Sequence, residues 1–194
     1  MAVQPGRYRL GPDHGRLILR TARDGLAATA GHDLTIEVPR WSGELTVSGN
    51  GDGPAPAALG LRIELGSLLV RRGTGGVKPL TDRDRREIAV TARKVLGTDR
   101  HPDAEFTADS FQAGPDDGWL VSGSLTLNGQ TGPVQLRVSQ TGDGRFRATA
   151  SVRQTQYGIK PYTAFLGALK VRDAVDIEAD AELADPDAGA GAAS

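Results

Sequence analysis

Apolar and polar residues alternate along most of the chain. The run VDIEADAEL is the clearest case, because Val175, Ile177 and Ala179 alternate with Asp176 and Glu178. Successive side chains of a β-strand point to opposite faces, so this period of two predicts strands with one face on a core. The same alternation gives an inward set in six further runs: Leu34, Ile36 and Val38; Leu61, Ile63 and Leu65; Ala104, Phe106 and Ala108; Trp119, Val121, Leu125 and Leu127; Val134, Leu136 and Val138; Phe146, Ala148, Ala150 and Val152.

The connections between these runs are short. NGQTG and TGDGR are rich in turn residues, which predicts hairpins and therefore antiparallel neighbours. Many antiparallel strands in one domain either stack as a sandwich or close as a barrel, because exposed edges promote aggregation. We expect an all-β fold with a single antiparallel barrel of about eight strands. A barrel of this size is filled by its own side chains or holds one small ligand, and the Ala, Val and Leu of the inward set favour a ligand.

One segment departs from the period of two. LTDRDRREIAVTARKVLG places Ile88, Ala92, Val95 and Leu96 on one face of a helix, which predicts an amphipathic helix over about 81–96. Thr81 is suited to the N-cap, and Gly97 to the C-cap. This helix should lie over or beside the sheet.

The length of 194 residues suits one domain with a substantial core. We expect it to cover residues 1–184, because the final stretch, residues 185–194, lacks large apolar side chains and is typical of a disordered tail. The start, MAVQPGRYRL, has no apolar run of signal-peptide length, and no stretch approaches 18 consecutive apolar residues. We therefore expect a cytoplasmic protein without stable membrane insertion.

Charge gives no general reason to expect nucleic-acid binding. The net charge is −1 and the pI about 6.3. Nine basic residues lie between Leu68 and Arg100, but no aromatic residue is interleaved with them to stack on bases. A solvated helix face is the simpler interpretation of this basic run.

No residue pattern indicates catalysis or metal binding. Cysteine is absent, and His14, His32 and His101 lie in separate turns without a close second histidine. Each histidine lies within two residues of an aspartate, but turn or capping roles explain such isolated pairs. No serine has the setting of a nucleophile elbow. We expect a protein that is not an enzyme and that has neither a metal site nor a cofactor.

The segment YGIKPYTAFLGALKVRD (residues 157–173) concentrates aromatic and basic side chains in a chain with 5% aromatic residues. We expect a short helical turn near 162–169, with Tyr162, Phe165 and Leu166 at the barrel mouth. They form either a lid over a ligand or a plug that seals a filled barrel. Lys160 and Lys170 would keep their ammonium groups in water beside this segment, where an anionic head group would meet them, with Arg71 and Arg72 as further candidates.

The order of several motifs resembles the YceI-like family of lipocalin-like barrels, which are associated with binding polyisoprenoids or related amphiphilic lipids. The resemblance runs from Tyr8 to Leu183 and includes YRLGPDHGRLILRT, WSGELTV, VLGTDRHPDAEFTADSF, VSGSLTLNGQTGPVQLRV and SVRQTQYGI. Gly15 stands where the family usually has serine, Gln154 where it has arginine, and Tyr157 where it has phenylalanine. The chain thus resembles a divergent branch without a signal peptide.

The resemblance implies that the barrel binds an amphiphilic lipid, such as a polyisoprenoid with a pyrophosphate head, for transport or storage. The alternative is a ligand-free stress-response or protein-interaction module with a filled barrel. A homodimer is possible in either case. We expect the apolar part of the ligand to contact Leu17, Leu19, Leu61, Ile63, Leu125, Leu127, Leu136, Phe146, Tyr157, Tyr162, Phe165, Leu166 and Ile177, and its head group to meet Lys160, Lys170, Arg71 or Arg72.

Overall fold

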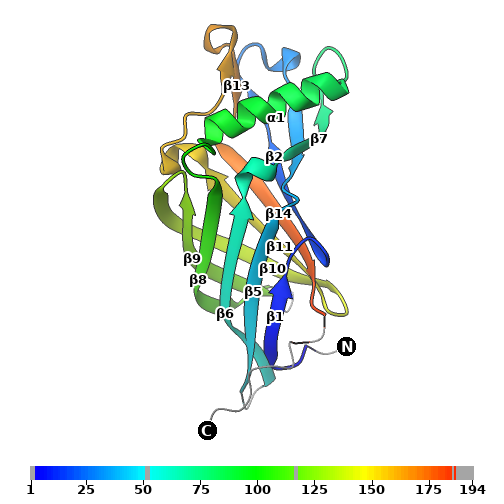
Figure 1. The fold of residues 1–194 in the computed structure, drawn as a ribbon, viewed down its shortest axis with the longest axis vertical. Coiled ribbons are helices and arrows are strands. Elements are labelled where there is room, and N and C mark those ends of the chain that lie inside the picture. Colours follow the sequence, from blue (N-terminus) through cyan, green and yellow to red (C-terminus); the bar gives the residue numbers. More distant parts are fainter. Residues whose placement is uncertain (1–2, 51–52, 116–117, 185, 187–194) are drawn as a thin grey trace.

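The fold is a strongly curled antiparallel sheet with one α-helix across its upper end (Figure 1). The computed structural model describes residues 3–50, 53–115, 118–184 and 186. The first described strand, β1, lies toward the opposite end of the molecule from the helix (Figure 1). The predicted all-β class, the antiparallel pairing and the single helix are confirmed. Most of the predicted tail, residues 185 and 187–194, lies outside the described residues.

Eleven strands form the main sheet, where about eight were expected. Their hydrogen-bonded order is β1 (Gly6–Leu10), β5 (Trp41–Asn50), β6 (Gly53–Glu64), β8 (Asp103–Ala113), β9 (Trp119–Leu127), β10 (Gln130–Gly142), β11 (Arg145–Arg153), β14 (Ala174–Glu182), β2 (Gly15–Thr21), β4 (Asp33–Glu37) and β7 (Leu69–Thr74). Among the described residues, the order runs from β1 to β7 without returning, so the sheet curls into a half-barrel rather than closing by hydrogen bonds.

The predicted number was wrong because the additional strands are short or lack clear alternation. β1 and β7 have five and six residues, and β7 carries two adjacent exposed arginines, Arg71 and Arg72. A separate small sheet joins β12 (Thr163–Ala164), β13 (Leu169–Val171) and β3 (Arg23–Asp24). The predicted hairpins at NGQTG and TGDGR are present as β9–β10 and β10–β11.

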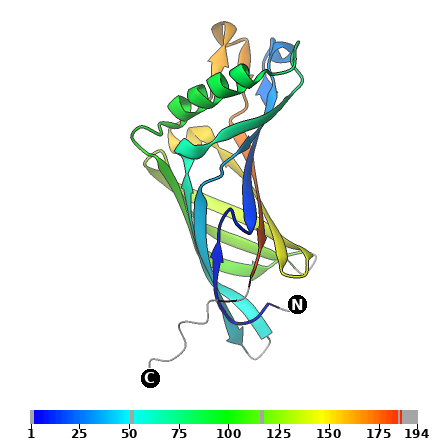
Figure 2. The same cartoon turned by 45° about the vertical axis from the view of Figure 1, so that its right-hand side comes forward.

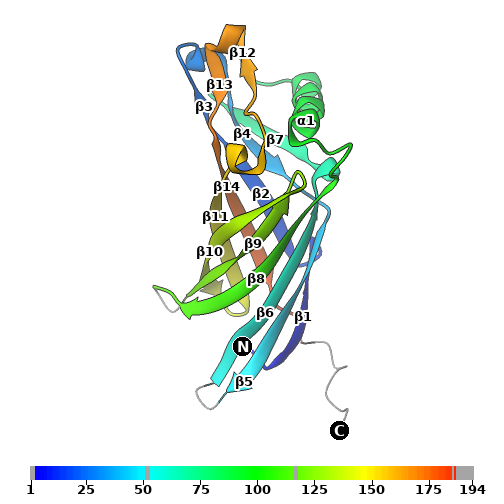
Figure 3. The same ribbon diagram turned by 90° about the vertical axis from the view of Figure 1, so that its left-hand side faces the viewer.

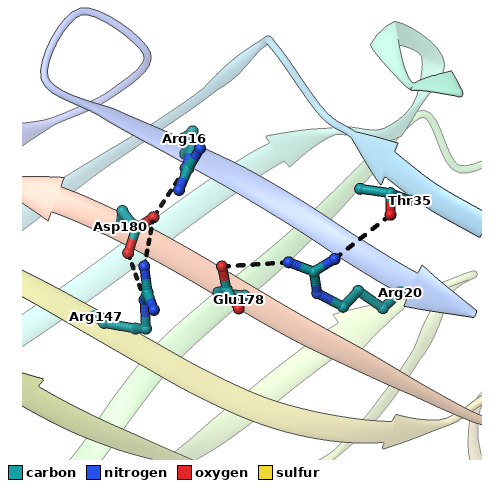
Figure 4. A network of polar contacts seen from close by, with 6 residues as sticks. All are labelled: Arg16, Arg20, Thr35, Arg147, Glu178 and Asp180. Carbon is teal, nitrogen blue, oxygen red and sulfur yellow. Dashed lines mark hydrogen bonds and ion pairs between the residues drawn. The ribbon is translucent and has the colours of Figure 1, made fainter. Parts of the chain in front are cut away.

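The two faces of the sheet follow the alternation of the sequence. On β14, Val175, Ile177 and Ala179 face inward, whereas Glu178 and Asp180 lie on the outer face among arginines of the neighbouring strands (Figure 4). Asp180 accepts hydrogen bonds from Arg16 Nε at 2.8 Å and from Arg147 Nε at 2.7 Å. This polar outer face and apolar inner face fix the register, because a slip of one residue would exchange them.

The helix α1 (Asp82–Leu96) begins and ends with the predicted caps. Thr81 and Asp84 form a reciprocal capping box, and Gly97 adopts a left-handed conformation with φ of 67°. Ala89 is buried within the cluster that includes Leu68 and Val70, and α1 packs beside β7. The helix therefore closes the upper side of the curled sheet (Figures 1 and 2).

Short 3-10 turns connect several strands: η1 (Ala28–Ala30), η2 (Leu65–Ser67), η3 (Gln154–Tyr157) and η4 (Phe165–Gly167). The helical turn expected near 162–169 is thus confined to 165–167. Thr163 and Ala164 pair with Lys170 and Leu169, so the rest of the segment is a β-hairpin. Within the described residues, no helix is long and apolar enough to span a membrane.

Candidate functional site

A cavity of about 560 Å³ occupies the space between the inner face of the sheet, α1 and the β12–β13 hairpin. Most of its lining side chains are aliphatic and come from strands far apart in sequence. Leu17 and Leu19 (β2), Leu61 and Ile63 (β6), Leu125 and Leu127 (β9), Leu136 (β10), Ala148 and Ala150 (β11) and Ile177 and Ala179 (β14) are among them. The walls offer dispersion contacts and few hydrogen-bonding groups.

The helix supplies one wall of this cavity. Ile88, Ala92, Val95 and Leu96, the apolar face predicted from the sequence, all line it. The capping box fixes where α1 begins, and therefore which of its side chains point at the sheet. The helix therefore contributes both to the wall of the cavity and to the hydrophobic core.

Several polar lining residues gather at the upper rim of the cavity. They include Arg23, His32, Glu87, Thr91 and Lys170, from β3, the η1–β4 connection, α1 and β13. Glu87 pairs with Arg83 at 2.9 Å, and Arg23 donates hydrogen bonds to the Gly31 and Thr74 carbonyls at 2.7 and 3.2 Å. For Lys170, by contrast, no side-chain hydrogen bond or ion pair is found in the described part of the chain, so its ammonium group is available to an anion.

The loop between β7 and α1 packs closely against this rim. Gly75 and Gly76 have φ of 78° and 72°, and a Cβ at either position would collide with the Arg23 guanidinium or the His32 ring. His32 Nε2 also lies 2.8 Å from the Lys78 carbonyl oxygen. The glycines of RRGTGGVKP therefore allow a close approach of backbone to side chain.

Gln154 links the cavity wall to the hairpin. It lines the cavity, is 7% exposed, and its Nε2 donates to the Arg172 carbonyl at 2.9 Å. Beside it, Thr155 donates to Asp173 through its backbone N–H at 2.8 Å and its hydroxyl at 2.7 Å, and these bonds lower the pKa of Asp173. The end of β11 is thereby tied to the start of β14.

The segment from Tyr157 to Phe165 changes from core to rim along its length. Tyr157 and Ile159 are fully buried, and burial raises the pKa of the Tyr157 hydroxyl. Tyr162 and Phe165 line the cavity but are 43% and 67% exposed. The first part of the segment anchors it, and the second part lies over the cavity opening.

The structure does not bring the three histidines together. His32 is at the rim, His14 is exposed between β1 and β2, and the ring of His101 lies against Gly129. Among the described residues, no group of three or more histidines and carboxylates is placed to hold a metal ion.

The sequence and the fold can be compared with those of known proteins. A family model described as the YceI-like domain matches residues 8–183. The chain belongs to the YceI-like family. Two UPF0312 proteins from Pseudomonas putida, strains F1 and KT2440, are each 29% identical to it over 84 residues. The match covers 39% of this chain and only 44% of those relatives.

Two solved structures share the fold of this chain. Burkholderia cenocepacia BcnA has a TM-score of 0.60 at 14% identity, covering 88% of this chain and 97% of that one. A polyisoprenoid binding domain from Saccharophagus degradans, implicated in plant cell wall breakdown, has a TM-score of 0.56 at 15% identity, covering 93% and 100%. At these identities the likeness establishes the fold alone.

Most of the apolar residues predicted to contact a ligand line the cavity of this YceI-like domain. They are Leu17, Leu19, Leu61, Ile63, Leu125, Leu127, Leu136, Tyr162, Phe165 and Ile177. Phe146 lies outside the lining. The last cavity-lining pair on β11 and β14 is Ala148 and Ala179, and Phe146 and Ala181 form the next inward-facing pair beyond it. Tyr157 is packed in the core, and Leu166 points into solvent, where it is fully exposed.

Of the four predicted head-group residues, the structure places only Lys170 in the cavity lining. Arg71 is paired with Glu37, which accounts for its charge, and Arg72 and Lys160 are exposed outside the lining. The sequence interpretation missed the α1 residues and the rim pair Arg23 and His32. The apolar face of α1 could have indicated that the helix lines the cavity, because this face was predicted to pack on the sheet.

Proposed function

We propose that this YceI-like chain binds one amphiphilic lipid, without catalysis, with the apolar part inside the cavity and an anionic head at the rim. The observation that carries the proposal is the hollow, aliphatic interior of about 560 Å³. Ligand sites in proteins typically have volumes of about 300–1,000 Å³ with apolar walls and few polar groups. A filled barrel, the alternative interpretation, leaves no such space.

The energetics suit this proposal. Burial of about ten methylene groups contributes roughly 8 kcal/mol, which is compatible with micromolar affinity after the costs of ordering the ligand. Lys170 is the basic rim residue with no partner in the described structure, so it suits a carboxylate or pyrophosphate. A polyisoprenoid is one such ligand, and the shared fold with the S. degradans polyisoprenoid binding domain supports this choice.

The proposal is tested by native mass spectrometry of protein purified from its own source, followed by organic extraction. The parent protein should carry a lipid of defined mass, at one molecule per chain. It should also bind a fluorescent isoprenoid at micromolar concentration. No extractable lipid together with no binding of the probe would refute the proposal.

A pair of variants on β11 locates the binding site. Ala150→Phe places a ring in the cavity and should weaken binding of the probe at least about tenfold, because the ring occupies the ligand's space. Ser151→Phe changes the next residue, which is exposed on the outer face, and should bind as the parent does. Equal binding by both variants would mean that the lipid sits elsewhere.

A further inference from the structure

Large apolar side chains project into solvent at the upper end of the molecule. Leu26 and Leu166 are fully exposed, and Val77 and Phe165 are 80% and 67% exposed. They come from three connections, residues 22–33, 72–80 and 158–172, which we call the tip. Figure 3 shows two of them, the β12–β13 hairpin and β3, side by side at the end of the molecule beyond α1.

Hydrogen bonds join the three connections of the tip into one surface. Ala27 N–H donates to the Ala168 carbonyl at 2.9 Å, and Lys170 pairs with Asp24 in the small sheet. Arg23 reaches the Thr74 carbonyl at 3.2 Å, which joins the third connection to the other two. The exposed apolar residues are therefore held in place relative to one another.

The backbone at the tip is held in a conformation that L-residues avoid. Phe165 and Leu166 have φ of 50° and 53°, in the left-handed region, and together they turn Leu166 away from the cavity. Strain of this kind persists where the surrounding structure enforces it, and it is concentrated at functional positions. Here the strain presents an aliphatic side chain to solvent instead of burying it.

The tip is also basic. Its residues include six cations, Arg23, Arg72, Lys78, Lys160, Lys170 and Arg172, against two aspartates, Asp24 and Asp33, whereas the whole chain has a net charge of −1. Apolar side chains surrounded by cations suit the interface of an anionic bilayer. The apolar side chains enter the head-group region, and the cations pair with lipid phosphates. A second copy of this chain fits less well, since two such tips would repel each other.

We propose that the tip docks peripherally on an anionic phospholipid surface, with Leu26 and Leu166 entering the head-group region. Phe165 and Lys170 belong both to the tip and to the cavity lining. Docking would therefore bring the cavity opening to the lipid surface, where a lipid could pass between bilayer and cavity. That exchange rests on the proposed function, whereas the docking does not.

Co-sedimentation with vesicles tests the docking. The protein should bind vesicles of phosphatidylcholine mixed with phosphatidylglycerol, bind pure phosphatidylcholine vesicles much less, and be released by added salt. Leu26→Ser with Leu166→Ser should reduce partitioning by at least about tenfold, because two buried leucines are lost. Leu69→Ser, at the end of β7 away from the tip, is the matched control and should partition as the parent does.

Charge reversal gives a second arm of the experiment. Lys78→Glu with Lys160→Glu should weaken partitioning into the anionic vesicles about tenfold or more, whereas Arg137→Glu on β10 should have little effect. Absence of binding to the anionic vesicles, or binding that the leucine variants leave unchanged, would overturn the proposal. Dimerisation abolished by Leu166→Ser, without vesicle binding, would overturn it in favour of a second copy.

The two proposals can fail separately. The double leucine variant should still carry a lipid in native mass spectrometry, because neither leucine lines the cavity. A parent protein that binds vesicles, but carries no lipid and does not bind the isoprenoid probe, would retain the docking surface and refute the lipid cavity.

Discussion

Tyr157 and Phe165 lie eight positions apart, yet they occupy opposite environments. Tyr157 is completely buried, and its hydroxyl lies 3.4 Å from the Gly132 carbonyl oxygen of β10. Phe165 is 67% exposed and covers part of the cavity opening. One aromatic side chain therefore belongs to the core, whereas the other lies at the cavity opening.

Alanine variants at the two positions should separate these roles. Tyr157→Ala should lower the free energy of unfolding by about 3–5 kcal/mol, because it leaves a hole in the core. Phe165→Ala should cost less than about 1 kcal/mol but weaken lipid binding. Urea denaturation and titration with a fluorescent isoprenoid measure the two effects. A large stability loss for Phe165→Ala would identify it as a plug rather than a lid.

The sequence predicted side chains in the middle of strands better than those at the ends of the cavity. Leu17, Leu125 and Ile177 follow the alternation and line the cavity. Leu166 was misplaced because its position depends on two consecutive left-handed residues, which neither composition nor periodicity reveals. Phe146 was placed on the correct face, but periodicity does not tell where along a strand a cavity ends.

At the scale of single elements, β14 shows how the outer face holds neighbouring strands together. Asp180 on this strand accepts hydrogen bonds from Arg147 on β11 and Arg16 on β2, and Arg20 lies 3.6 Å from Glu178 (Figure 4). The hydrogen bonds from Arg147, followed by those from Arg16, lower the pKa of the Asp180 carboxyl. The ionised carboxylate therefore stabilises the folded state.

The stability provided by Asp180 should depend on pH. Its pKa is lower in the folded than in the unfolded state, so the contribution is complete above the ordinary carboxyl pKa of about 4 and is lost as the pH falls below it. Asp180→Asn should therefore cost about 0.5–1 kcal/mol at pH 7, since these ion pairs are partly solvated, and progressively less below pH 4.

Asp176→Asn is the control for this measurement. Asp176 is exposed on the same strand and the same face, and its carboxylate has no partner in the described structure. Its replacement should cost less at pH 7, as measured by urea denaturation at several pH values. Equal costs for the two variants would mean that the pairing at Asp180 adds nothing to stability.

Among the elements, those with a strong repeating pattern were predictable from sequence. β14, β11 and α1 have a clear period of two or a clear helical stripe, and all three are present with the expected faces. The small sheet of β12, β13 and β3 was missed because two of its strands contain only two residues each. Such short strands exist because of long-range pairing, which local patterns do not encode.

For the whole molecule, the sheet has two ends that lack a hydrogen-bonded neighbour among the described residues, β1 and β7. Amide exchange should accordingly be slowest in β9, β10 and β11, which have partners on both sides, and faster along the outer edge of β1. Hydrogen exchange followed by mass spectrometry measures this difference. Exchange in β1 as slow as in β9 would indicate that another element covers the edge.

The two end strands of the sheet, β1 and β7, also affect how the width of the cavity can change. In a closed barrel, the number of strands and their stagger fix the diameter, so a larger occupant requires different side chains. Here curvature sets the width instead, because the distance between β1 and β7 can change without breaking a hydrogen bond between them. If the cavity binds a lipid as proposed, we expect ligands of different girth to be accommodated by bending this wall, and α1 to move together with β7, against which it packs.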